Sequence, residues 1–348
     1  MKKYLFFLLI ILMVSITFAK ENPRVFIFTD INIDQGDPDD RQSLIHLFWY
    51  ADELTIEGIV PDRWNAQGYE ACLLALEAYT KDYQNNNLKA KDYTSPGNIK
   101  QLIAKDSNHA TRLFQKAAAR TDSPLYVLIW GNMKLFKSIL LQNPELSENI
   151  RLLTIGTGLM LERSMAYLPE DWEKHPPCQQ INWNGPGRNE VYTNSRFDSM
   201  WWLEMNWTYE GMFRGEEPAE MFTKLTEYGR MGKHIKAVVK NHDWAQYFRV
   251  GDTPSVLYVI DPGHDLDDPT EPSWAGKFTK PFPTGRPNYY TDFSGDVEWD
   301  YANPCATWEN HEQVLEIAVK TLLDNRQAMY EALIQKLNAL YSTKSKQE

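Results

Sequence analysis

The stretch that decides the fold is RVFIFTDINIDQGDPDDRQSL, residues 24–44. It begins with a short β-branched and aromatic run, Arg24 to Thr29, which predicts a strand. Apolar residues then recur at helical spacing over residues 41–52, which predicts a helix. Five carboxylates lie between the two, in the eleven residues from Asp30 to Asp40. The stretch therefore predicts a strand, an acidic loop and a helix in immediate succession.

The same alternation continues along the chain. Short apolar runs predict further strands at residues 55–61, 125–130, 150–155 and 255–260. Helical spacing predicts helices at residues 66–82, 133–141 and 311–341. Strands that are apolar on both faces and alternate with helices are typical of a parallel sheet covered on both sides. We expect an α/β fold of three layers, with an open, mostly parallel, Rossmann-like sheet.

The second half of the chain is less regular and rich in aromatic residues. Trp201 and Trp202 lie in a run that we interpret as helical, and we expect them in the core because adjacent helix positions cannot both face one ligand. A carbohydrate-binding platform is the alternative for these aromatic residues. No repeat and no sharp change of composition divides the chain, so we expect a single domain over residues 20–348.

Composition and charge narrow the classes of partner. The 348 residues are 43% hydrophobic and 24% charged, which is typical of a globular protein. Asp and Glu number 47 against 36 Lys and Arg, for a net charge of −11. A chain this acidic repels a phosphate backbone and an anionic bilayer surface. We therefore expect neither a nucleic-acid polymer nor a membrane surface as partner.

The first residues resemble a targeting segment. Lys2 and Lys3 precede an apolar run that ends at Ala19, which predicts a cleaved signal peptide over residues 1–19 and an exported protein, periplasmic or extracellular. An uncleaved anchor is the alternative. Three cysteines are too few for a disulfide scaffold. Cys72 is expected to be a buried thiol, and Cys178 and Cys305 are candidates for a bridge.

The acidic loop is the strongest candidate for a functional site. Ligands of an open parallel sheet bind at the carboxyl ends of its strands, and the loop follows the first strand directly. Crowded carboxylates repel one another by several kcal/mol unless a cation or hydrogen-bond donors neutralise them. Carboxylates without His or Cys suit Ca²⁺ or Mg²⁺. The alternative is that Asp37 or Asp39 only caps the following helix.

Motifs in a fixed order along residues 24–335 resemble the nucleoside hydrolase superfamily, in particular its Sde182-type, nucleoside-hydrolase-like branch. Residues 29–44 contribute Thr-Asp, Pro-Asp-Asp and Gln-Ser-Leu. The remaining motifs are Trp130-Gly131, Trp201-Trp202-Leu203-Glu204, Tyr209-Glu210-Gly211-Met212 and Gly251-Asp252-Thr253-Pro254-Ser255. The resemblance implies the fold of these hydrolases and a Ca²⁺ at the floor of the pocket.

The resemblance also implies a metal-ligand set. Carried over, the ligands are Asp30, Asp40, Asp252 and the backbone carbonyl of Trp130. These are all oxygen donors, as a hard divalent ion prefers. In the hydrolases, a metal-bound water that the first Asp deprotonates attacks the anomeric carbon. That role falls on Asp30 here.

Sugar-binding positions follow from the same resemblance. Asp39 would accept a hydrogen bond from a ribose hydroxyl, and Asp252 would belong to the same binding set. The loop over residues 182–190 is rich in amides, and Asn184 and Asn189 are its candidates for binding sugar hydroxyls. A surface turn is the alternative for this loop. Gly187 stands where the hydrolases have a Glu, if Asn189 is matched.

The chain departs from the hydrolases in two respects. Eight residues separate Asp30 from Asp39, where the hydrolases have three, so Asp34 or Asp37 is an alternative to Asp30. Gly251 stands where many hydrolases have a His that helps the leaving base depart.

We favour a metal-dependent hydrolase of a glycosyl bond, of the N-ribosyl type, in a small glycoside or nucleoside. The alternative is an exported, non-catalytic sugar- or glycan-binding protein that uses the metal as a hydroxyl anchor. A purely structural metal is a third interpretation. A homo-oligomer is compatible with the sequence, which specifies no partner surface.

Overall fold

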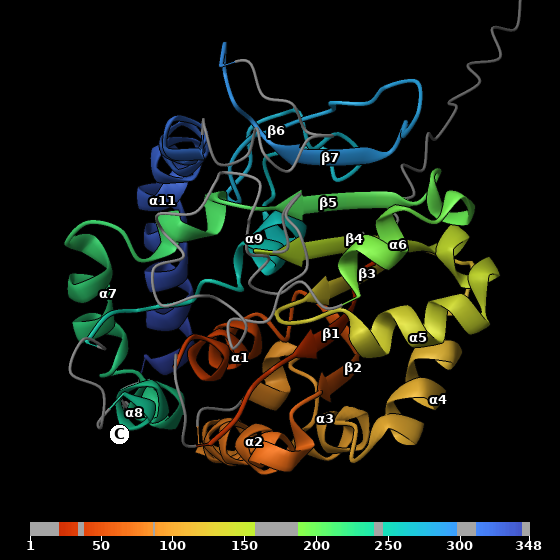
Figure 1. Cartoon of the computed structure of the whole chain (residues 1–348). Helices are drawn as coiled ribbons and strands as arrows, with labels where there is room; N and C mark the ends of the chain where they lie inside the picture. The colour runs from red at the N-terminus through yellow and green to blue at the C-terminus, as the bar shows by residue number, and fades with distance from the viewer. Residues whose placement is uncertain are drawn as a thin grey trace, which may run out of the picture.

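Within the described part of the chain, a seven-stranded sheet runs through the middle of the molecule (Figure 1). The computed structural model describes residues 21–33, 38–85, 88–156, 187–239, 246–297 and 311–342. Several sequence predictions lie outside the described residues: the signal peptide over 1–19 and the residues Asp34, Asp37, Asn184, Cys178 and Cys305.

The sheet is parallel except at one edge. Its order is β2-β1-β3-β4-β5-β7-β6, and only β6 runs antiparallel to its neighbour. The strands are β1 (Arg24–Thr29), β2 (Thr55–Pro61), β3 (Leu125–Ile129), β4 (Ile150–Ile155), β5 (Trp201–Met205), β6 (Phe278–Thr279) and β7 (Tyr289–Asp292). The first four match the predicted strands, because each is a short run that is apolar on both faces.

Helices cover both faces of this sheet, as the three-layer prediction requires (Figure 1). Their bounds are α1 (Asp39–Trp49), α2 (Gly68–Asn85), α3 (Pro96–Leu102), α4 (Ser107–Ala118), α5 (Lys134–Gln142), α6 (Arg188–Tyr192), α7 (Glu217–Leu225), α8 (Gly229–Val238), α9 (Pro254–Ile260) and α11 (His311–Tyr341). One core cluster joins the sheet to α1, α2, α8, α9 and α11. A second cluster joins the opposite face to α4 and α5.

The predicted helix around Trp201 and Trp202 is wrong, because this run forms β5. Successive side chains of a strand point to opposite faces, so the two indoles enter the two different core clusters. Both are buried, and the prediction that they belong to the core is confirmed. The buried Cys72 thiol on α2 is confirmed as well.

The predicted strand over residues 255–260 is also wrong. The run forms α9, whose seven residues are all buried. A fully apolar run has no polar face by which helix and strand can be distinguished. Pro254 occupies the first turn of α9, a position that suits proline because its missing N–H is not needed there.

In the described part of the chain, no helix combines the length and the apolar composition needed to cross a bilayer.

Candidate metal centre

Three carboxylates converge at the carboxyl edge of the sheet. Asp39 and Asp40 lie in the first turn of α1, and Asp252 lies two residues before α9. One carboxylate oxygen of each lies within 4.8 Å of the others. We call these three residues the acid cluster. Because it joins positions far apart in the sequence, only the folded chain forms it.

The carboxyl of Asp40 is strongly perturbed by its place in the acid cluster. Burial raises the pKa of its carboxyl well above the usual value, and the neighbouring Asp252, Asp30 and Asp39 raise it further. The Thr29 hydroxyl donates a hydrogen bond to Asp40 Oδ1 and opposes the shift. The Asp40 N–H donates to Asp39 Oδ1 at 2.9 Å. Burial and the neighbouring carboxylates therefore both disfavour the charged form of Asp40.

A divalent cation fits this donor set. The cluster offers only carboxylate oxygens, which are the ligands that Ca²⁺ and Mg²⁺ prefer. Bringing three carboxylates together, two of them almost wholly buried, is unfavourable unless positive charge or hydrogen-bond donors compensate them. The surroundings therefore suit a hard divalent ion.

Gly251 lies against the acid cluster and two aromatic rings. A Cβ atom at this position would lie 3.2 Å from Asp39 Oδ2, 3.4 Å from the Phe213 ring and 3.5 Å from the Tyr209 ring. A side chain at this position requires a small shift of the Asp39 carboxylate, whereas its Cβ would lie at ordinary contact distance from the two rings.

Asp30 lies beside the acid cluster and is not one of its three members. Its carboxylate forms an ion pair with Arg63, which follows β2. A Cβ atom at Gly131 would lie 2.8 Å from Asp30 Cβ, so the chain after β3 packs directly against Asp30. The charge of Asp30 still reaches Asp40, whose pKa it raises.

Trp130 also lies at this edge, at the end of β3. Its side chain is buried and donates from Nε1 to Ser255 Oγ at 2.8 Å. Ser255 Oγ in turn donates to the carbonyl of Asp252 at 2.7 Å. The indole thus supports the turn that carries Asp252.

Sequence reasoning missed Asp62 at the end of β2. Asn132 donates to its Oδ2 at 2.8 Å, and the buried Oδ1 has no hydrogen-bond partner among the described residues. Burial and the charge of Asp30 raise the pKa of Asp62 to about 7. Its place directly after a predicted strand, like that of Asp30, is the signal that would have identified it.

Asn189 lies on α6, where its Oδ1 accepts from Arg188 Nη1 at 3.0 Å. Arg188 forms a buried, bidentate ion pair with Glu204 of β5, with distances of 2.8 and 2.5 Å. The Tyr289 hydroxyl also donates to Glu204, at 2.5 Å. Asn189 is therefore attached to a buried polar network.

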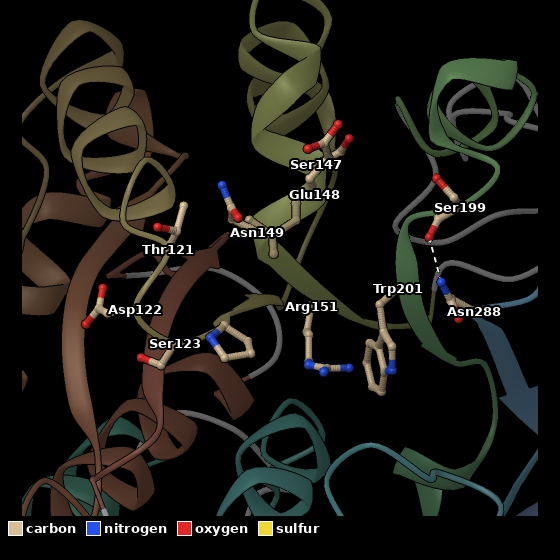
Figure 2. Close-up of a pocket in the computed structure, with 12 residues that line it drawn as sticks. Thr121, Asp122, Ser123, Ser147, Glu148, Asn149, Arg151, Ser199, Trp201 and Asn288 are labelled. Carbon is tan, nitrogen blue, oxygen red and sulfur yellow. Dashed lines mark hydrogen bonds between the residues drawn. The ribbon is translucent and has the colours of Figure 1, made fainter.

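A separate cavity of about 420 Å³ lies at the opposite, amino-terminal edge of the sheet (Figure 2). Segments that precede β3, β4, β5 and β7 line it. Figure 2 shows Arg151 and Trp201 extending side by side from neighbouring strands, and the guanidinium carbon lies 5.1 Å from the indole centroid. Ligands of parallel sheets bind at the carboxyl edge, so we assign the chemistry to the acid cluster and not to this cavity.

Comparison with known proteins supports the fold. A solved nucleoside hydrolase-related protein from Saccharophagus degradans, associated with carbohydrate metabolism, is 17% identical, with a TM-score of 0.60 over 93% of this chain and 73% of that one. An inosine-uridine preferring nucleoside hydrolase from Bacillus anthracis is 12% identical, with a TM-score of 0.44 over 86% of this chain and 99% of that one. A purine-preferring ribonucleoside hydrolase from Gardnerella vaginalis is 11% identical, with a TM-score of 0.41 over 85% of this chain and 99% of that one. At 17% identity, the likeness to the Saccharophagus degradans protein shows the fold alone.

Comparison with curated protein sequences gives no match. A family model matches residues 24–278, which include the acid cluster and the five strands β1 to β5. Its description is "cellulose-binding Sde182, nucleoside hydrolase-like domain". The match covers well over half of the chain and agrees with the sequence motifs, so the chain belongs to the Sde182-type, nucleoside hydrolase-like family.

Proposed function

We propose that the acid cluster holds a divalent cation, Ca²⁺ in the first instance, and that the site hydrolyses a glycosyl bond in a small glycoside or nucleoside. The observation that carries the proposal is the convergence of Asp39, Asp40 and Asp252 within 4.8 Å, with Asp40 buried. When bound, the ion would lower the pKa of a coordinated water and would coordinate neighbouring sugar hydroxyls.

The chain's own residues divide the remaining work. Asp30, oriented by its ion pair with Arg63, takes the proton from the attacking water. Asp39 accepts a hydrogen bond from a sugar hydroxyl and so fixes the ring relative to the water. The bond between the anomeric carbon and the leaving group breaks as the new carbon–oxygen bond forms. The Trp130 carbonyl and Asn184 remain candidates for binding the ion and the sugar respectively.

A second function is a non-catalytic, glycan-binding protein that uses the ion as a hydroxyl anchor. Two observations favour it. The family description names cellulose binding. Gly251 stands where many hydrolases have the histidine that helps the leaving group depart. We also propose export through residues 1–19, which N-terminal sequencing of the secreted protein would test.

One set of measurements separates these functions. Calorimetric titration with Ca²⁺ is run on the wild type, on Asp252→Asn and on Asp106→Asn. Asp106 caps α4 outside the acid cluster, and Asn serves nearly as well there, so this variant is a control for the loss of one charge. We expect Asp252→Asn alone to lose Ca²⁺ affinity. Unchanged affinity in Asp252→Asn would show that the metal site is wrongly placed.

Release of reducing sugar from nucleosides and from cello-oligosaccharides then tests catalysis. An enzyme shows turnover that Asp30→Asn abolishes while Ca²⁺ still binds. A binding protein shows Ca²⁺-dependent affinity for one of these ligands and no release. If Ca²⁺ changes only the thermal stability, the metal is structural and both functions fail.

A further inference from the structure

The acid cluster is assembled from two separate parts of the chain. Asp39 and Asp40 begin α1, and Asp252 belongs to the segment 247–253 that leads into α9. The two parts are far apart in the sequence: His46 on α1 and Thr253 in the segment are separated by 207 positions. Something must fix one part against the other for the carboxylates to meet.

Gln42 makes the first connection. It lies on α1 two residues after Asp40, its side chain is fully buried, and both ends of its amide are used. Nε2 donates to the carbonyl of Tyr247 at 3.2 Å, and Oε1 accepts from the N–H of Arg249 at 2.7 Å. The side chain thus pairs with the segment as a neighbouring strand would.

His46, one turn further along α1, makes the second connection. Its Nδ1 lies 3.0 Å from Thr253 Oγ1. The Thr253 hydroxyl already donates its hydrogen to the carbonyl of Val250 at 2.9 Å, so Nδ1 carries the proton and donates. Burial lowers the pKa of the ring to about 3, which keeps it neutral, and Phe248 packs against it at 5.1 Å between ring centroids.

These contacts bracket Asp252 on both sides. Gln42 holds the segment three and five residues before it, and His46 holds the residue directly after it. We infer that Gln42 and His46 are positioning residues that fix the segment 247–253 on α1 and so set the distance of Asp252 from Asp40. The inference rests on the proposed metal site for its functional meaning.

The experiment compares Gln42→Leu with Gln115→Leu. Gln115 is the matched control, because its amide also joins two elements, α4 and the end of α5, away from the acid cluster. Two quantities are measured: the Kd for Ca²⁺ by calorimetry, and hydrogen exchange of peptides over residues 246–260. We expect Gln42→Leu to weaken Ca²⁺ binding at least tenfold and to speed exchange in these peptides, and Gln115→Leu to change neither.

The His46 connection is tested by a pair of variants. His46→Asn keeps a donor near the place of Nδ1, whereas His46→Leu removes it. We expect Ca²⁺ affinity close to that of the wild type for Asn and a clear loss for Leu. Equal losses in both variants would reduce His46 to a packing residue and overturn its part of the inference.

The remaining outcomes also decide the question. If Gln42→Leu speeds exchange and leaves the Kd unchanged, the connection is structural only and the inference is wrong. If Gln42→Leu fails to fold, Gln42→Glu replaces it, since Glu keeps the acceptor for Arg249 and sets an acceptor against the Tyr247 carbonyl. If the wild type binds no Ca²⁺, the proposed function fails, and exchange alone then decides whether Gln42 fixes the segment.

Discussion

Replacing Asp40 by Asn should stabilise the protein when no metal is present. The substitution keeps the shape of the side chain and the acceptor for the Thr29 hydroxyl, and it removes one charge from the acid cluster. Two full charges 4.8 Å apart repel by about 3.5 kcal/mol at an effective dielectric constant of about 20. Because the raised pKa of Asp40 already relieves part of this repulsion through protonation, we expect a gain of about 1–3 kcal/mol in the free energy of unfolding.

Urea denaturation in EDTA and in excess Ca²⁺ measures this gain. In EDTA, Asp40→Asn should be more stable than the wild type, and the Asp106→Asn control should be unchanged. In Ca²⁺ at a hundredfold excess over Kd, the wild type should gain about 2.7 kcal/mol and the variant should gain little, so the advantage of the variant should vanish or reverse. An Asp40→Asn protein that is less stable than the wild type in EDTA would refute the argument, since the carboxylates would then not repel one another in the folded state.

Three further predictions concern pH, a buried ion pair and a glycine. The folded protein binds a proton at Asp40 more tightly than the unfolded chain does, so stability in EDTA should fall as pH rises from about 4. The gain in stability from Ca²⁺, measured by thermal melts, should therefore be larger at pH 8 than at pH 5, and an equal gain at both pH values contradicts this. Glu204→Gln leaves the buried Arg188 charge without its carboxylate and should cost about 3–5 kcal/mol in urea denaturation, while a loss below about 1 kcal/mol would mean that water replaces the partner. Gly229→Ala should destabilise the N-terminus of α8, because φ is +63° there and a Cβ atom would lie 2.6 Å from an Asp82 oxygen that accepts from the helix N–H groups. An unchanged melting temperature would show that the backbone can shift at no cost.

The sheet could be predicted from the sequence because a strand that is buried on both faces is a continuous run of apolar residues. The first four strands are short apolar runs with turn residues at their ends, and a helix follows each of the first three. The same reasoning failed at α9, since a helix buried on every side is as apolar as a buried strand. The proline at its first turn was the overlooked signal.

The candidate site could be predicted in part. Asp39, Asp40 and Asp252 meet in the structure, and the position of Asp252 came only from the order of motifs, because spacing along the chain carries no information on contacts across 200 residues. Asp62 was missed because a lone carboxylate after a strand is common. Its partners, Asn132 and Asp30, come from two other strand ends, and only the folded sheet brings them together.

The bond between His46 and Thr253 spans 207 positions of the chain, so it cannot form until the second half of the chain has docked on α1. Contacts of such long range are made late in folding, after local helices and neighbouring strands. The acid cluster therefore exists only in molecules in which the segment 247–253 is docked on α1. The luminescence of a lanthanide ion bound at the acid cluster would then rise only when the two parts dock during refolding. It would report the yield of fully folded molecules, whereas circular dichroism also detects partly folded ones.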